Sequence, residues 1–174
     1  MKKNVFLIGF MACGKSTIGK DLALQLNCAF LDTDLLIEKK VKKNIKDFIA
    51  ENGEIAFRIW ENKIVKEIIG NTEKSVVATG GGLACSQENI ELLKKSGVLI
   101  FIDAPEELIF KRLKGDPTRP LIANLNDAEL KTFISTKLKE RKEFYNQATI
   151  KIEGKKDSKE IIGEICEKLK LLSL

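Results

Sequence analysis

The segment at residues 9–16 constrains the fold of this chain more than any other feature. It reads Gly-Phe-Met-Ala-Cys-Gly-Lys-Ser, which fits the pattern G-x-x-x-x-G-K-S. An uninterrupted apolar run at residues 4–8 precedes it, and apolar residues at helical spacing follow it, at Ile18, Leu22 and Leu26. A buried strand, a glycine-bounded loop and an amphipathic helix in this order predict a phosphate-binding loop, because the loop N–H groups and the helix N-terminus converge on an anion.

The residue types in the loop match the groups of a nucleotide. We expect Lys15 to reach the β- and γ-phosphates and the Ser16 hydroxyl to bind Mg²⁺. The other contacts to ATP are expected from Gly9, Met11, Ala12, Cys13, Gly14 and Thr17. The sequence therefore predicts a site for ATP and Mg²⁺ over residues 9–17, with the Cys13 thiol near the phosphates.

Strand-like and helix-like segments alternate along the rest of the chain. Short apolar runs predict four more strands, at residues 29–31, 75–79, 98–102 and 149–152. Helical spacing predicts helices at residues 35–41, 45–51, 54–69, 87–95, 105–113, 127–145 and 158–172. This alternation favours an α/β fold in three α/β/α layers, with a five-stranded parallel sheet in one domain over residues 1–174. Ligands of such folds bind at the carboxyl ends of the strands.

The composition argues against several function classes. The 174 residues include no histidine, which removes His-dependent nucleophilic catalysis and His-ligated zinc. The net charge of +5 is mild and evenly spread, which favours a pocket for anions over a nucleic-acid surface. Four cysteines without a C-x-x-C pair and the lack of a long uncharged run predict a cytoplasmic protein that is not in a membrane. Lys2 and Lys3 precede an apolar stretch, but no polar cleavage region follows, so we expect no processed leader.

A phosphate-binding loop does not by itself define a reaction. Guanine-specific switches carry N-K-x-D and D-x-x-G; here the pair Asn62-Lys63 lacks the Asp, and no Asp is followed three residues later by Gly. A chain of this length also leaves no room for the further domains of a motor or a pump. Two classes remain, a compact ATP-dependent kinase of a small molecule and a nucleotide-binding module without turnover.

Several motifs together resemble those of the shikimate kinase family over essentially the whole chain. They are G-F-M-A-C-G-K-S-T-I-G at residues 9–19, L-D-T-D at 31–34, F-R at 57–58, T-G-G-G at 79–82, T-R-P-L at 118–121 and E-R-K-E-F-Y at 140–145. The resemblance implies a fold like that of nucleoside-monophosphate kinases and the phosphorylation of a shikimate hydroxyl by ATP with Mg²⁺. We expect a monomer. Gluconate- and nucleotide-type kinases share the first motif and remain alternatives.

Two carboxylates follow the second predicted strand. In an extended segment the i, i+2 spacing would place Asp32 and Asp34 on the same side. Asp32 would then hold Mg²⁺, and Asp34 would bind the acceptor hydroxyls and accept a proton, a division of roles that the resemblance also implies. Helix capping by the same carboxylates is the structural alternative.

Two arginines are implied by the resemblance to bind the acceptor carboxylate, and a guanidinium suits this planar anion bidentately. They are Arg58 and Arg141. From the sequence alone, an ion-pair ladder with Glu54 and Glu61 is the structural alternative for Arg58, and Arg141 looks like part of an ordinary helix surface. The helices around residues 33–69 are expected to bind the acceptor.

Glycines and a proline-containing segment complete the predicted site. Gly80, Gly81 and Gly82 follow a strand and are expected to donate backbone N–H groups to the acceptor. Residues 114–126 are expected to form a lid that brings Arg119 to the transferred phosphate and excludes water. Arg112, just before this segment, is implied by the resemblance to pack on adenine.

Overall fold

The computed structural model describes residues 4–71, 73–116, 119 and 121–172. Its strands are β1 (Asn4–Ile8), β2 (Ala29–Asp32), β3 (Ser75–Ala78), β4 (Gly97–Asp103) and β5 (Ile150–Glu153). Its helices are α1 (Lys15–Gln25), α2 (Thr33–Val41), α3 (Ile45–Gly70), α4 (Gln87–Ser96), α5 (Glu106–Leu113), α6 (Asp127–Tyr145) and α7 (Ser158–Leu171). A 3-10 turn at Leu83–Cys85, which the sequence did not predict, lies between β3 and α4.

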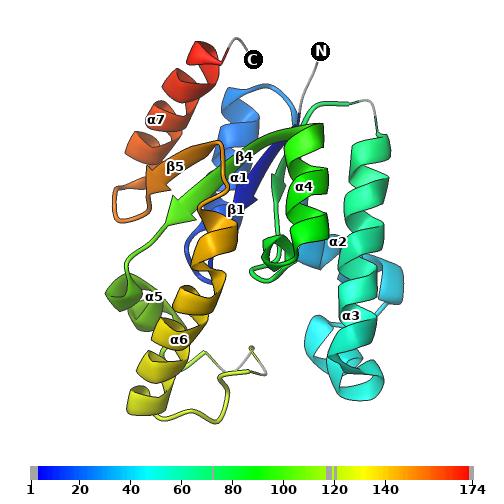
Figure 1. Ribbon diagram of the computed structural model, residues 1–174, viewed down its shortest axis with the longest axis vertical. Coiled ribbons are helices and arrows are strands. Elements are labelled where there is room, and N and C mark those ends of the chain that lie inside the picture. The colour runs from blue at the N-terminus through cyan, green and yellow to red at the C-terminus, as the bar shows by residue number, and fades with distance from the viewer. Residues whose placement is uncertain (1–3, 72, 117–118, 120, 173–174) are drawn as a thin grey trace.

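The strands form a parallel sheet in the order β2-β3-β1-β4-β5. β1 lies at the centre, where Val5 is opposite Val76 of β3 and Val98 of β4. Parallel neighbours need crossover connections, and the helices between the strands provide them (Figure 1). The predicted five-stranded parallel sheet is confirmed.

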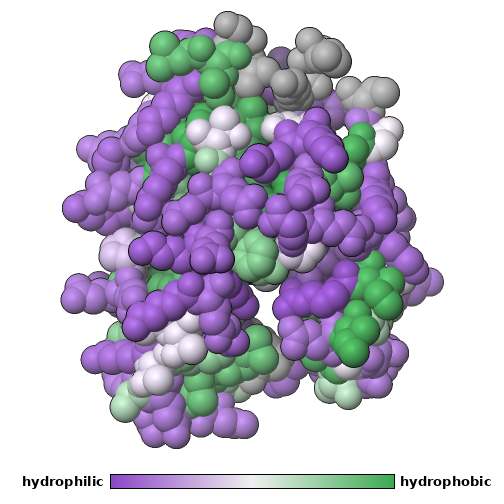
Figure 2. All heavy atoms as spheres, in the orientation of Figure 1, coloured by the Kyte–Doolittle hydropathy of each residue, from purple (hydrophilic) through white to green (hydrophobic). Residues whose placement is uncertain are grey.

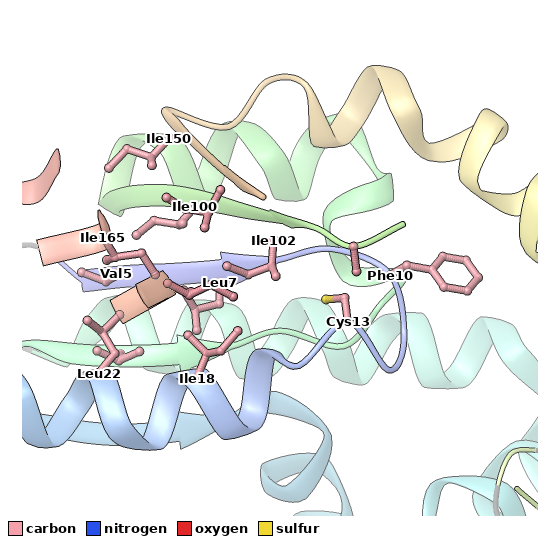
Figure 3. Packing of buried hydrophobic residues seen from close by; sticks show 14 of the residues in the cluster. Val5, Leu7, Phe10, Cys13, Ile18, Leu22, Ile100, Ile102, Ile150 and Ile165 are labelled. Carbon is pink, nitrogen blue, oxygen red and sulfur yellow. The ribbon is translucent and has the colours of Figure 1, made fainter. Parts of the chain in front are cut away.

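The two faces of the sheet are covered by different helices. Val5 and Leu7 of β1 pack in a cluster with α1 and α7 residues, whereas Phe6 and Ile8 pack on the other face with residues of α3 and α4. Figure 3 shows part of the first cluster, with the β1 side chains packed on those of α1 and α7. The predicted three-layer arrangement is therefore confirmed, and β1 is buried along its whole length.

The start of α2 differs from the expectation. Asp32 is the last residue of β2 and the N-cap of α2, and its carboxylate accepts hydrogen bonds from the N–H groups of Asp34 and Leu35. A carboxylate at this position satisfies free N–H groups of the first helical turn. Asp34 is thus helical and not extended, and the predicted extended geometry of residues 32–34 is wrong at Asp34.

The helix α3 contains a break that the sequence prediction placed correctly. The helix runs from Ile45 to Gly70, but Gly53 within it has φ 81° and ψ 165°, which is not helical. After the break, the side chain of Phe57 is buried, whereas that of Trp60 is only partly buried. Glu61, which the alternative interpretation of Arg58 placed in an ion-pair ladder on the helix surface, is 1 % exposed.

The carboxyl ends of the strands face the lower half of the molecule in Figure 1, where α6 and the N-terminal part of α3 extend beyond the sheet. Figure 2 shows a hollow between these two extensions, on a face covered mostly by hydrophilic side chains. Among the described residues, no helix combines the length and apolarity that crossing a membrane requires.

Truncation of Leu99 in β4 tests the buried core. Leu99 is 0 % exposed, so Leu99→Ala is expected to lower the free energy of unfolding by about 2–5 kcal/mol, since it removes apolar contacts and leaves a cavity. Leu171→Ala is the matched control, because Leu171 is 84 % exposed and its loss should cost less than about 0.5 kcal/mol. Urea unfolding measures both, and equal effects would contradict the assignment of β4 to the core.

Candidate functional site

A pocket of about 410 Å³ lies beyond the carboxyl ends of β1 and β3. It gathers most of the predicted nucleotide- and metal-binding residues, together with Asp34 and Gly81. These lining residues are Met11, Ala12, Cys13, Gly14, Lys15, Ser16, Thr17, Asp32, Asp34, Gly81, Arg112 and Arg119. Gly9 is absent from the lining; it makes the turn into the loop with φ 143°, and a Cβ there would lie 2.8 Å from the Ile102 carbonyl oxygen.

The loop after β1 encloses a lysine ammonium. Lys15 is the first residue of α1, after Gly14 in a left-handed conformation (φ 107°). Its Nζ donates hydrogen bonds to the carbonyl oxygens of Gly9 and Phe10, both at 2.9 Å. A cation therefore sits beside the positive end of α1, and the combination favours an anion in the pocket.

The thiol of Cys13 lies inside the loop. Cys13 is 1 % exposed, and its Sγ is 3.6 Å from the Lys15 Nζ. Figure 3 shows the sulfur directed back toward the apolar cluster. The residue lines the pocket, but its thiol does not project into solvent.

Two side-chain oxygens meet at the edge of the pocket. The Ser16 hydroxyl donates to Asp32 Oδ2 at 2.7 Å, while Asp32 Oδ1 accepts from the Asp34 N–H at 3.1 Å. Asp32 therefore caps α2 and contacts the loop at once; the capping interpretation is confirmed, and a role in holding Mg²⁺ stays a prediction. In the described part of the chain no three His, Cys, Asp or Glu residues form a metal-binding group. A hydroxyl and a carboxylate nevertheless fit Mg²⁺, which keeps several waters and binds phosphate oxygens.

Asp34 lies in the first turn of α2 and faces the same pocket. Burial raises the pKa of its carboxyl to about 6, the Asp32 charge adds to the rise, and the Lys15 and Arg119 charges oppose it. Within the described residues its Oδ1 is buried and accepts no hydrogen bond. Buried polar atoms are nearly always paired, so this oxygen fits a hydroxyl donor from a ligand.

A second pocket, of about 680 Å³, brings together the two predicted acceptor-binding arginines. Arg58 comes from α3 and Arg141 from α6, and Gly82 and Glu61 also line the pocket. Arg141 therefore does not lie on an ordinary outer helix surface, because it faces a cavity that it shares with residues of α3.

Arg58 is held by two carboxylates of its own helix. Its Nη1 and Nη2 atoms donate to Glu61 and Glu54, each at 2.6 Å. Both ion pairs of the alternative interpretation are therefore present, but the Glu61 carboxylate is buried. Burial raises the pKa of Glu61, and the Arg58 charge opposes this rise. The Oε1 atom of Glu61 has no hydrogen-bond partner among the described residues. The sequence analysis missed Glu61 as a site residue. Its helical spacing from the apolar residues Phe57 and Ile64 was a usable signal that it would be buried.

The three glycines after β3 allow side chains of the site to approach the backbone. A Cβ on Gly80 would lie 2.5 Å from Asp34 Oδ1, and one on Gly82 would lie 2.7 Å from Arg58 Nη1. The Gly80 N–H already donates to Thr33 Oγ1 at 2.8 Å. This N–H is therefore already paired within the protein, and its donation to an oxygen of the phosphoryl acceptor stays a prediction.

Gly81 lies where the two pockets adjoin. Its carbonyl oxygen accepts hydrogen bonds from Arg141 Nη1 at 3.1 Å and from the Tyr145 hydroxyl at 2.7 Å. A Cβ on Gly81 would lie 3.1 Å from the Met11 backbone nitrogen, so the glycine loop touches the loop after β1. Gly81 lines the first pocket and Gly82 the second.

The remaining two predicted arginines, Arg112 and Arg119, also line the first pocket. Arg112 Nη1 donates to the Ala12 carbonyl at 2.8 Å, and Arg119 Nε pairs with Asp116 at 3.3 Å. Pro117, Thr118 and Pro120 of the expected lid lie outside the described residues. Three residues that follow β5 also line this pocket: Gly154, Lys156 and Ser158. The sequence analysis did not predict them, because their position after the end of a strand was the only signal.

Comparison with known proteins agrees with the motifs and the geometry. The sequence model of the shikimate kinase family matches residues 11–170. A shikimate kinase of Azobacteroides pseudotrichonymphae is 45 % identical over 85 % of this chain and 88 % of its own length, and one of Persephonella marina is 42 % identical over 94 % and 99 %. The structure is similar to that of the Acinetobacter baumannii shikimate kinase in complex with shikimate, with a TM-score of 0.91, 30 % identity and coverage of 99 % and 95 %. This chain belongs to the shikimate kinase family.

Proposed function

We propose that this chain is a shikimate kinase that transfers the γ-phosphoryl group of ATP to a shikimate hydroxyl, giving shikimate 3-phosphate and ADP. One observation carries the proposal beyond family membership. A pocket built on a phosphate-binding loop adjoins, at Gly81 and Gly82, a pocket lined by two arginines. A triphosphate and an organic acid bound there would lie side by side, which is the arrangement that phosphoryl transfer needs.

The first pocket would hold ATP. The loop N–H groups and Lys15, at the positive end of α1, would bind the phosphates. Arg112 and Arg119, which also line this pocket, would contact the nucleotide, Arg112 at the base and Arg119 at the transferred phosphate. An arginine that meets developing phosphate charge stabilises the transition state.

Magnesium would be held by Ser16 and Asp32, whose oxygens already meet at 2.7 Å. When bound, the ion neutralises phosphate charge and thereby supports the transfer. The protein supplies few ligands of its own there, in keeping with a cation that favours waters and phosphate oxygens.

The second pocket would bind the acceptor. Arg58 and Arg141 would hold its carboxylate, each through the fork of its guanidinium. Asp34, with a buried oxygen that accepts no hydrogen bond within the described residues, would bind the acceptor hydroxyl and take its proton as the phosphoryl group arrives. Phosphoryl transfer needs little covalent help from the protein, so positioning and charge carry most of the catalysis.

The remaining expectations rest on family membership. We infer a monomer that acts in the cytoplasm, and a lid over residues 114–126 that closes on both substrates. Exclusion of water by such a lid would limit the hydrolysis of ATP in the absence of an acceptor.

A coupled assay of ADP release tests the proposed function. With shikimate as acceptor we expect turnover well above the acceptor-free background, and with gluconate or AMP no more than that background. Faster turnover with gluconate or AMP would assign the chain to another small-molecule kinase. ATP binding without turnover on any acceptor would point to a nucleotide-binding module.

Loss of Arg58 should weaken acceptor binding selectively. Arg58→Ala is expected to raise the dissociation constant of shikimate by about 30- to 1,000-fold, which corresponds to ~2–4 kcal/mol for truncating one partner of a buried charge pair. ATP affinity should change by less than about twofold, because Arg58 does not line the first pocket. Titration calorimetry with each substrate measures both.

The matched control is Arg112→Ala, which removes an arginine from the first pocket. It should weaken ATP and leave shikimate affinity unchanged. Arg58→Lys separates charge from geometry, since it keeps the cation and removes the fork. A collapse of ATP affinity in Arg58→Ala with shikimate affinity intact would contradict the assignment.

Asp34 should make the free protein less stable as the pH rises. Its pKa of about 6 lies above the unfolded value of 3.8, so the folded state binds more protons between these values and loses stability as the pH rises through 6. Asp34→Asn cannot ionise and should raise the free energy of unfolding at pH 8 by more than it does at pH 5. Urea unfolding in EDTA measures this, with the exposed Asp21→Asn as the control; an equal effect of Asp34→Asn at both pH values would refute it.

A further inference from the structure

Phe10 is a loop residue for which phosphate binding provides no role. It occupies a variable position of the G-x-x-x-x-G-K-S pattern and is 1 % exposed. Figure 3 shows its ring directed beyond the end of β1 and away from the aliphatic side chains of the cluster, whereas the Cys13 sulfur points back toward them. The ring therefore extends from the nucleotide loop to the region where α6 passes.

The Arg141 guanidinium of α6 lies over this ring. Its Cζ is 5.3 Å from the centroid of the Phe10 ring. A guanidinium within about 6 Å of an aromatic face is attracted by the negative face of the ring, and the attraction grows when the pair is shielded from water. An arginine of the acceptor pocket thus rests on a residue of the nucleotide loop.

A second contact fixes the same guanidinium from another side. Arg141 Nη1 donates to the Gly81 carbonyl, and the Tyr145 hydroxyl donates to the same oxygen. Tyr145 is itself immobilised, since it is fully buried and stacks on Phe101 with ring centroids 5.0 Å apart. The carbonyl that Arg141 contacts is therefore held firmly in place.

A free arginine side chain samples many rotamers, and ordering it on ligand binding costs affinity. Contacts that order it beforehand remove part of that cost. The ring of Phe10 and the carbonyl of Gly81 are such contacts for Arg141, and only one of them comes from the nucleotide loop.

We propose that Phe10 is a positioning residue for the acceptor: its ring holds the Arg141 guanidinium in the orientation that binds the acceptor carboxylate. A residue of the nucleotide loop thereby sets affinity for the acceptor and not for ATP. The inference rests on the proposed function, because it takes Arg141 as an acceptor-binding residue.

The first experiment compares two identical substitutions in buried phenylalanines. Phe10→Leu should raise both the dissociation constant and the KM of shikimate by about three- to tenfold, in line with a shielded cation–π contact, with ATP affinity changed less than about twofold. Phe6→Leu is the control, since Phe6 is also fully buried but packs in the other core cluster. It should lower stability and leave shikimate affinity unchanged. Equal shikimate affinity in Phe10→Leu and wild type would overturn the proposal.

The second experiment separates ring electrostatics from packing. Phenylalanine analogues with one, two and three ring fluorines, incorporated at position 10, keep nearly the same shape while weakening the negative face of the ring. Shikimate dissociation constants should rise stepwise along the series, and ATP dissociation constants should stay level. A flat shikimate series would overturn the proposal, because a ring that acts by packing alone is insensitive to its electron distribution.

The outcome for wild type separates this inference from the proposed function. A wild-type protein with shikimate-dependent ADP release and a flat fluorination series refutes only the role of Phe10. A wild-type protein that neither binds nor phosphorylates shikimate refutes the proposed function, and the inference fails with it.

Discussion

The central position of β1 is the constraint on which the site depends. Because β3 and β4 flank β1 in parallel, the segments that leave the three strands emerge at the same edge of the sheet. The loop after β1 therefore meets the glycines after β3, and a Cβ on Gly81 would press on the Met11 backbone. The loop after β1 and the pocket that contains Arg58 and Arg141 are neighbours for this topological reason, before any side chain contributes.

The site concentrates buried charge, which opposes folding. Asp34 and Glu61 each bury an oxygen that no described group of the chain pairs, and burial raises the pKa of both carboxyls. Arg58 offsets part of this cost through its 2.6 Å contact with Glu61. Groups arranged in this way are poised for a ligand, since a donor supplied from outside would satisfy oxygens that the free protein leaves unpaired.

The fold, and the gathering of residues 11–17 in one pocket, could be predicted from the sequence, because these follow from local patterns. The strand, loop and helix around residues 4–25 specify one another within a short stretch, and the alternation of elements specifies the parallel sheet. Sequence analysis missed one local contact, the capping by Asp32 that begins α2 and makes Asp34 helical. It also missed two contacts between distant segments: the hydrogen bond of the Gly80 N–H to Thr33, and the burial of Glu61 against other elements.

The break at Gly53 divides α3 into two helical segments. Helical hydrogen bonding transmits rotation along an unbroken helix, but a residue with φ 81° and ψ 165° interrupts the regular screw. The half that carries Arg58 takes its orientation from its own packing on the sheet layer, through Ile64 and Ile68. The outer half, residues 45–52, is held in the same cluster through Phe48, so the two helical segments are joined by side-chain packing as well as by the backbone.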